Sequence, residues 1–402
     1  MKVCFYTAQY CSEPIRRVQL GIGYLGAYLQ RELPELDIAY ALTHKDAIAF
    51  NPDVLCVSST SQVLSDAVAL AGKLPKAKKI LGGYHVSALP HLLPKEFDIG
   101  VVGEGESTLF SLLRLDDWSN VPGTCNKPPV DRLDMAGIPF PYRDRKGNGN
   151  EYMFTSRGCP FNCIYCASSR NWGKVSAAPP ERVVEEIKLL RTEYKATHIT
   201  MLDDLFAYSV SRLDRIVTLM EREKLAGQVR FHGFVRANLV SEEMVKLLKR
   251  MGFVSVRFGA ETMGPELLKF LKNGPASPED AQRTVDICHK HGLNVGASLV
   301  FGSPSETERD LDLTFDFLQR NRGKVGISGF YLLTPYPGTE LWDIAVKKGL
   351  VSEDMDWSRL SLDFLKPEFD WRRAVYMNAD VIPVDRFKQI VHRFRSTFLK
   401  GR

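Results

Sequence analysis

The chain has 402 residues, of which 44% are hydrophobic and 25% are charged, and its formal net charge is +5 at pH 7. This composition is typical of a globular protein with two or three domains. It contains no long basic run of the kind that follows a phosphate backbone, which argues against a nucleic-acid partner. The start of the chain has no secretory signal pattern, and no window reaches the roughly 18 apolar residues that span a bilayer. We therefore expect a cytoplasmic protein without a membrane span.

The first 125 residues alternate short runs rich in Val, Ile and Leu with amphipathic helical patterns. Repeated β–α–β units predict a parallel sheet covered on both faces, and right-handed crossovers make it a doubly wound, flavodoxin-like α/β domain. The expected strands are residues 2–7, 37–42, 53–59, 78–83 and 98–103, and the clearest helices are residues 20–33 and 61–74.

The alternation stops near residue 121. Residues 121–150 contain five prolines and four glycines, which predicts a linker, placed at 126–150. Longer β–α units then fill 151–345 and predict a partial (βα)6 barrel with its active site at the carboxyl ends of the strands. Residues 346–402 form a small helical or mixed segment. The expected barrel strands are residues 151–156, 198–203, 229–236, 253–261, 294–302 and 326–334.

Serine residues mark the starts of several barrel helices. Ser241 and Ser277 are expected to cap the helices that follow them, because a serine hydroxyl accepts a hydrogen bond from an otherwise unpaired amide at a helix start. Ser305 and Glu308 match the spacing of a capping box.

Three of the eight cysteines lie close together, on the loop after the first expected barrel strand. Cys159, Cys163 and Cys166 have the spacing C-x3-C-x2-C. Thiolates suit iron–sulfur clusters or zinc, and three ligands leave a fourth position open for a substrate or cofactor. The alternatives are a zinc site completed by a distant histidine, or three unrelated thiols. The scattered cysteines, expected to be small buried hydrophobes, are Cys4, Cys11, Cys56, Cys125 and Cys288.

With an aromatic residue before its last cysteine, at the start of a partial barrel, this motif resembles the signature of the radical S-adenosylmethionine (SAM) superfamily over residues 150–345. The resemblance implies a [4Fe–4S] cluster whose unligated iron binds the amino and carboxylate groups of SAM. One electron from the cluster would then cleave the cofactor to a 5′-deoxyadenosyl radical, which abstracts hydrogen from an unactivated carbon.

The resemblance also implies SAM-binding residues at the carboxyl ends of the barrel strands. Each has an ordinary structural alternative: loop packing for Tyr165, helix capping for the Asp pair, a rim salt bridge for Arg236, a helix-dipole contact for Glu261 and turn structure for the last three. The implied residues are Tyr165, Asp203, Asp204, Arg236, Glu261, Ser298, Phe301 and Gly302.

The amino-terminal domain resembles the cobalamin-binding branch of that superfamily over most of residues 18–142. No Asp-x-His-x-x-Gly motif is present, so no histidine from such a motif can ligate cobalt, and His44 and His85 are candidates by default. Glycines allow a bulky ligand to approach the backbone. The residues that the resemblance places around cobalamin are Ser58, Ser59, Thr60, Gly82, Gly83, His85, Gly103, Glu104 and Gly105.

The resemblance favours a cobalamin-dependent radical methylase acting on a small molecule or peptide, with an external one-electron reductant of the flavodoxin or ferredoxin type. The first alternative is a radical dehydratase, dehydrogenase or rearrangement enzyme acting on a sugar or natural product, with an amino-terminal domain that binds no cobalamin. The second is a non-catalytic scaffold that carries a cluster or zinc.

Overall fold

The computed structural model describes residues 1–10, 14–127, 132–144, 149–364 and 369–399. Cys11 lies outside the described residues. The chain divides into two compact units: the amino-terminal unit contains Met1–Asn148 with the short segments Ser176–Pro179 and Asp356–Ser358, and the carboxyl-terminal unit contains the rest. Among the helices in the described ranges, none is both long and apolar enough to cross a bilayer.

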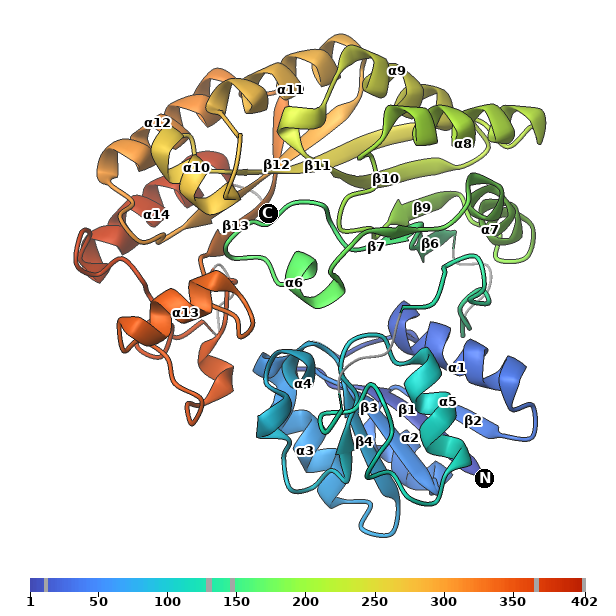
Figure 1. Cartoon of the computed structure of the whole chain (residues 1–402). Helices are drawn as coiled ribbons and strands as arrows, with labels where there is room; N and C mark the ends of the chain where they lie inside the picture. Colours follow the sequence, from blue (N-terminus) through green and yellow to red (C-terminus); the bar gives the residue numbers. More distant parts are fainter. Residues whose placement is uncertain (11–13, 128–131, 145–148, 365–368, 400–402) are drawn as a thin grey trace. The chain divides into compact units, whose positions relative to one another are not determined.

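The amino-terminal unit contains a five-stranded sheet in the order β2-β1-β3-β4-β5, in which every neighbouring pair is parallel. This order is the flavodoxin-like one expected for a doubly wound domain, and the predicted fold class is confirmed (Figure 1). The strands are β1 (Lys2–Thr7), β2 (Asp37–Ala41), β3 (Val54–Ser58), β4 (Lys78–Gly82) and β5 (Ile99–Gly100). The helices are α1 (Leu20–Glu32), α2 (His44–Phe50), α3 (Leu64–Gly72), α4 (Tyr84–Ala88) and α5 (Glu106–Arg114), and 3₁₀ turns occupy Ser61–Val63 and Pro90–Leu92.

The period-2 alternation of β1 divides the apolar residues between two cores. Val3 and Phe5 join the core that contains residues of α1 and α5, whereas Cys4 and Tyr6 join the core that contains residues of α2 and α3. Side chains of successive strand residues point to opposite faces. Both faces of this sheet are therefore covered, as its continuous apolar strands predict.

The carboxyl-terminal unit contains a six-stranded parallel sheet in the order β13-β12-β11-β10-β9-β6, which is the chain order expected of a partial barrel. In Figure 1, α8, α9, α11 and α12 run along one side of this curved sheet. The strands are β6 (Asn150–Met153), β9 (His198–Met201), β10 (Arg230–Val235), β11 (Phe253–Glu261), β12 (Asn294–Phe301) and β13 (Val325–Leu332). The main helices are α7 (Pro180–Thr192), α8 (Val210–Arg222), α9 (Glu242–Met251), α10 (Pro265–Lys272), α11 (Pro278–Lys290), α12 (Glu308–Arg320), α13 (Glu340–Lys347) and α14 (Val384–Phe398). Shorter elements of this unit are β7 (Ser156–Arg157), α6 (Ser168–Trp172) and η3 (Ala237–Leu239), whereas β8 (Ser176–Ala177) and the start of η4 (Trp357–Arg359) belong to the amino-terminal unit.

The helix starts agree with the sequence at two of the three expected positions. Ser241 accepts from the amide of Met244, and Ser277 forms a capping box with Asp280. The expectation at Ser305 was wrong: Thr307 caps α12, in a capping box with Asp310. Ser305 has a φ of 65°, a left-handed conformation that an N-cap residue does not adopt, because the N-cap is extended.

A buried carboxyl group, that of Glu306, stabilises the turn between β12 and α12. Its Oε2 accepts a hydrogen bond of 2.7 Å from the amide of Gly302, and its backbone carbonyl accepts one from the Asn378 side chain. Glu306 is 1% exposed, and burial raises its pKa to about 8. The folded protein therefore holds a protonated carboxyl group here at neutral pH.

We expect Glu306→Gln to make the protein more stable than the wild type at pH 8. Between about pH 4.5 and pH 8 the unfolded chain releases the Glu306 proton while the folded chain retains it, so wild-type stability falls as the pH rises through this window. The advantage of the variant, measured by urea unfolding, should grow by roughly 2–4 kcal/mol between pH 5 and pH 8. Exposed Glu279→Gln is the control, and an equal pH dependence in both variants would contradict this assignment.

Candidate active site

The three clustered cysteines lie on the loop between β7 and α6. Cys163 is buried, and Cys159 and Cys166 are partly exposed; all three thiols are free. The amide of Cys166 donates to the carbonyl of Cys163 at 3.1 Å, which folds the motif into a turn. Burial raises the pKa of Cys159 and raises that of Cys166 to about 11. Thiolates buried in this way need a coordinated cation to stabilise them.

Main-chain hydrogen bonds hold this loop to two helices of the same unit. The amide of Ile164, next to Cys163, donates to the carbonyl of Leu271 in α10 at 3.0 Å. The carbonyl of Ile164 accepts at 3.0 Å from the amide of Leu341 in α13. The position of the cysteines is therefore fixed by elements more than a hundred residues further along the chain.

The Asp pair after β9 divides into a buried and an exposed carboxylate. Asp203 is 1% exposed and accepts hydrogen bonds from the amide and hydroxyl of Thr155 and from the hydroxyl of Ser156. Asp204 is exposed and accepts from the amide of Gly158, next to Cys159. Asp203 therefore joins β9 to the start of the cysteine loop, whereas Asp204 leaves part of its carboxylate free for a cationic ligand.

The side chain of Arg236, at the end of β10, lies directly against the cysteine loop. Its Nη1 donates to Sγ of Cys163 at 3.2 Å, and its guanidinium carbon lies 3.9 Å from the centre of the Phe161 ring. Its Nη2 is buried and has no hydrogen-bond partner among the described residues. A buried, unpaired guanidinium nitrogen is suited to an anionic ligand group such as a carboxylate.

Tyr165, Glu261 and Lys272 form a buried triad beside the cysteines. Oε1 of Glu261 accepts from the hydroxyl of Tyr165 at 2.7 Å and from Nζ of Lys272 at 2.5 Å. Glu261 and Lys272 are 5% and 7% exposed. Glu261 has a φ of 57°, a strained conformation that persists only where the surroundings enforce it. Gly259 makes room for the triad, because a Cβ there would lie 2.1 Å from Oε1 of Glu261.

Sequence reasoning missed Lys272. In the sequence it is an ordinary basic residue in the last turn of a helix, where a lysine usually complements the helix dipole at the surface. Its burial depends on α10 packing beside the end of β11, which no local pattern reveals. Oε1 of Glu261, a residue that the resemblance assigned to cofactor binding, is already hydrogen-bonded to Tyr165 and Lys272.

The three residues expected around β12 have different environments. The Ser298 hydroxyl lies 3.0 Å from that of Ser328. Phe301 is 2% exposed and packs edge-to-face against Phe330, Phe364 and Phe394, the environment of a core residue. Gly302 has a φ of 79°, and a Cβ there would lie 2.9 Å from Leu332.

The amino-terminal unit has a cavity at the carboxyl ends of β3 and β4. Five of the nine residues expected around cobalamin line it: Ser58, Gly82, Gly83, Gly103 and Gly105. Its other walls are apolar and include Phe5, Ile22, Leu25 and Leu109. These four were not predicted as ligand residues, because they appear in the sequence as ordinary core positions of β1, α1 and α5.

The other four expected residues do not line this cavity. His85 is 1% exposed, lies 2.9 Å from the Ser61 hydroxyl, and packs edge-to-face against Trp357 of the same unit. Burial lowers the pKa of His85 to about 4. Ser59 is buried, Thr60 is exposed, and Glu104 pairs with Arg132 at 2.5 Å. Trp357 packs against the core that contains α2 and α3, whereas Phe5 and Leu109 of the cavity belong to the other core.

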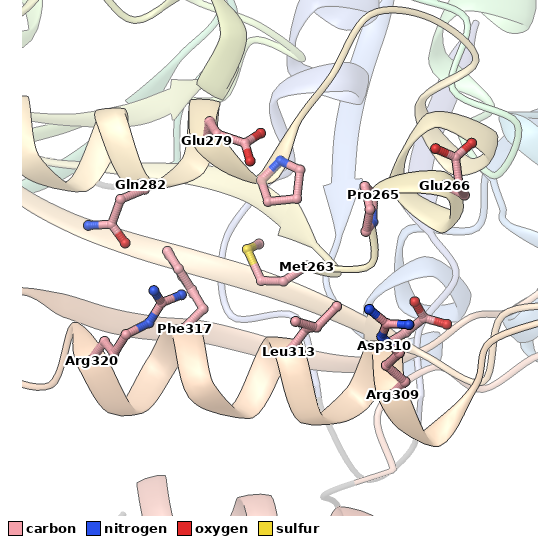
Figure 2. Close-up of a pocket in the computed structure, with 11 residues that line it drawn as sticks. Met263, Pro265, Glu266, Glu279, Gln282, Arg309, Asp310, Leu313, Phe317 and Arg320 are labelled. Atoms are coloured by element: carbon pink, nitrogen blue, oxygen red, sulfur yellow. The ribbon is translucent and has the colours of Figure 1, made fainter.

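A larger groove of about 680 Å³ lies in the carboxyl-terminal unit, between α10, α11 and α12. Figure 2 shows its lining, with Arg309 and Arg320 at opposite ends and Met263, Leu313 and Phe317 between them. No cysteine of the C-x3-C-x2-C motif lines it. The volume of a cavity alone therefore does not locate the active site of this protein.

Known proteins resemble this chain in both sequence and fold. Residues 153–318 match the family model of the radical SAM superfamily. An uncharacterised methyltransferase of Pyrococcus horikoshii is 30% identical over 377 residues, which cover 85% of this chain and 81% of the relative. The chain belongs to the radical SAM superfamily. It is a radical SAM enzyme, and its three motif cysteines are the ligand set typical of that family's cluster.

Two further relatives of this radical SAM enzyme are methyltransferases. A bacteriochlorophyllide d C-8(2)-methyltransferase of Chlorobaculum tepidum is 26% identical, over 78% of this chain and 73% of its own. The solved structure of the radical SAM methyltransferase TsrM from Kitasatospora setae, with tryptophan and a SAM analogue bound, has a TM-score of 0.77 and 19% identity. It covers 98% of this chain and 88% of that one, and at this identity the likeness shows a shared fold.

The donor set and its surroundings fit a cluster and SAM. Three thiols on one loop leave one coordination position open, and Nη2 of Arg236 and the exposed carboxylate of Asp204 offer opposite charges beside them. No three His, Cys, Asp or Glu side chains among the described residues come close enough together to hold a single metal ion. The fit therefore rests on the donor chemistry and on the supports of the loop.

We expect Lys272→Met to destabilise the protein by about 3–5 kcal/mol, because it leaves the Glu261 carboxylate buried without its cation. The double variant Lys272→Met/Glu261→Gln should recover much of this loss, since the amide can still accept from Tyr165. Urea unfolding of the protein without cofactors measures both. Lys269→Met, which removes an exposed lysine from the same helix, is the matched control, and an equal cost in Lys269→Met and Lys272→Met would refute the buried pair.

Proposed function

We propose that this radical SAM enzyme is a cobalamin-dependent methylase that acts on an unactivated carbon of its substrate. The observation that carries the proposal is the loop of Cys159, Cys163 and Cys166, which main-chain hydrogen bonds hold in place. Its three thiolates would bind a [4Fe–4S] cluster and leave one iron open. The glycine-lined cavity of the amino-terminal unit and the methyltransferase relatives extend the proposal to methyl transfer with cobalamin.

The residues around the cysteine loop would bind and orient SAM. When bound, the cluster and SAM together supply a 5′-deoxyadenosyl radical for hydrogen abstraction. The free guanidinium nitrogen of Arg236 is suited to the carboxylate of the cofactor, and the exposed carboxylate of Asp204 to its ammonium group. The Tyr165 ring, fixed through its hydroxyl by Glu261, would form a rigid wall beside the cofactor.

The cavity of the amino-terminal unit would hold part of cobalamin, which supplies the methyl group when bound. Gly82, Gly83, Gly103 and Gly105 line this cavity without contributing side chains, and its apolar walls suit a flat aromatic group. A solved structure of TsrM holds both cobalamin and a [4Fe–4S] cluster, with a TM-score of 0.72 over 91% of this chain and 83% of that one. We further propose a small molecule or peptide as substrate and an external one-electron donor of the flavodoxin or ferredoxin type.

We expect Cys163→Ala to abolish 5′-deoxyadenosine formation, because the cluster loses one of its three ligands. The measurement is anaerobic reconstitution with iron and sulfide, followed by reduction with dithionite in the presence of SAM and chromatography of the products. Cys288→Ala, which removes a buried cysteine of α11 that lies outside the motif, is the control and should keep both cluster and cleavage. Cleavage of SAM by a variant with all three motif cysteines replaced by alanine would overturn the catalytic assignment.

We expect Gly82→Leu to abolish the retention of cobalamin without unfolding the protein. A Cβ at Gly82 has only one neighbour within 4 Å, the carbonyl oxygen of Val57 at 3.9 Å, so a leucine can fill the cavity without backbone strain. The measurement is the absorbance of hydroxocobalamin that stays with the reconstituted protein after desalting. Gly21→Leu, on the exposed side of α1, should retain cobalamin as the wild type does. A wild type that cleaves SAM but retains no cobalamin would favour the radical enzyme of another reaction type.

A further inference from the structure

The two faces of the barrel sheet differ in their chemistry. Along β11, Val256 and Phe258 are 1% exposed, whereas Ser255 is partly exposed and Arg257 is exposed. Alternate residues of a strand point to opposite faces, so Ser255 and Arg257 lie on the face of the sheet opposite the apolar core positions. We call this surface the concave face of the barrel. Layers of bulky branched apolar side chains usually fill the interior of a closed barrel.

Polar and small side chains instead occupy part of the concave face, beside Phe234 of β10, which pairs in register with Arg257. Nδ1 of His232 lies 2.7 Å from the Ser255 hydroxyl, and the Ser298 hydroxyl lies 3.0 Å from that of Ser328. The His232 ring also stacks on that of His198, with 5.7 Å between their centres. These contacts join neighbouring strands across the sheet.

Arg257 lies on this face beside Gly296 of β12, with which it pairs in register. A Cβ at Gly296 would lie 3.2 Å from Cβ of Ser328 and 3.8 Å from Cγ of Arg257. The stem of Arg257 and the side chain of Ser328 therefore flank the same glycine. No hydrogen bond or ion pair joins the Arg257 guanidinium to another residue in the part of the chain that the structure describes.

The surroundings of Arg257 favour an anionic ligand. A guanidinium presents its donors in a planar fork that matches the oxygens of a carboxylate or phosphate. Burial, His198 and Arg257 lower the pKa of His232, so its ring is a neutral hydrogen-bonding group at pH 7. In the Ser298–Ser328 pair one hydroxyl donates to the other, so the second hydroxyl can donate to a further oxygen of the same anion.

We propose that Arg257 binds a carboxylate or phosphate group of the substrate on the concave face of the barrel. This inference rests on the proposed function and adds the substrate class: a hydrophilic molecule with an anionic group, as opposed to a hydrocarbon-like lipid. Glu261 of the triad lies four positions after Arg257 in β11, which is about 13 Å along an extended strand.

The experiment measures how fast phenylglyoxal modifies individual arginines of the full-length, anaerobically reconstituted protein, with peptide mass spectrometry as the readout. The probes are inorganic phosphate and malonate, with glycerol as the neutral control. Either anion should slow modification of Arg257 about fivefold, the factor expected when four-fifths of the sites are occupied. Arg309, which is exposed in the outer groove of Figure 2, is the internal reference and should be modified at an unchanged rate.

Variants test the same inference without relying on arginine chemistry. Phosphate or malonate should raise the melting temperature of the wild type and of Arg309→Gln, and this increase should be lost in Arg257→Gln. Protection by phosphate alone or by malonate alone would identify the anionic group. Equal modification of Arg257 with and without both anions, or an unchanged thermal shift in Arg257→Gln, would overturn the proposal. Cleavage of SAM by the same preparation reports separately on the proposed function.

Discussion

A buried ion pair between Glu261 and Lys272 lies behind the loop that carries the three motif cysteines. Each of these charges would be costly in the protein interior without the other, and together they fix the hydroxyl of Tyr165. The amide next to Cys163 donates to the carbonyl of Leu271, the residue before Lys272. One helix end thus holds the loop both through its backbone and through a side chain.

The cysteine-loop end of the barrel and its concave face differ in whether their polar side chains are engaged by the protein. At the mouth, buried side chains such as Asp203 and Glu261 fix the backbone that carries the cysteines, and their polar atoms are occupied by protein partners. On the concave face, Arg257 and its serine neighbours are accessible, and the guanidinium is not engaged by the described protein. A rigid cofactor site and an open polar surface suit a reaction in which the radical must form at a defined place and the substrate must enter and leave.

In the amino-terminal unit, the cavity and the buried His85 are associated with different cores of the sheet. The glycine-lined cavity has apolar walls from the core of α1 and α5, whereas Trp357, which contacts His85, packs against the other core. Burial keeps the His85 ring neutral and commits it to packing. A ligand in the cavity would therefore meet glycine backbone and apolar side chains rather than an imidazole.

The sequence by itself determined the fold class and the cysteine motif. The spacing of Cys159, Cys163 and Cys166 is a local covalent property, and the strand and helix periods follow from which residues must be buried. Only the tertiary structure decided which Asp of the pair is buried, that Phe301 belongs to an aromatic core, and that Lys272 completes a triad with Tyr165, 107 residues away. These outcomes depend on which strand and helix ends lie side by side, and the period of a segment does not contain that information.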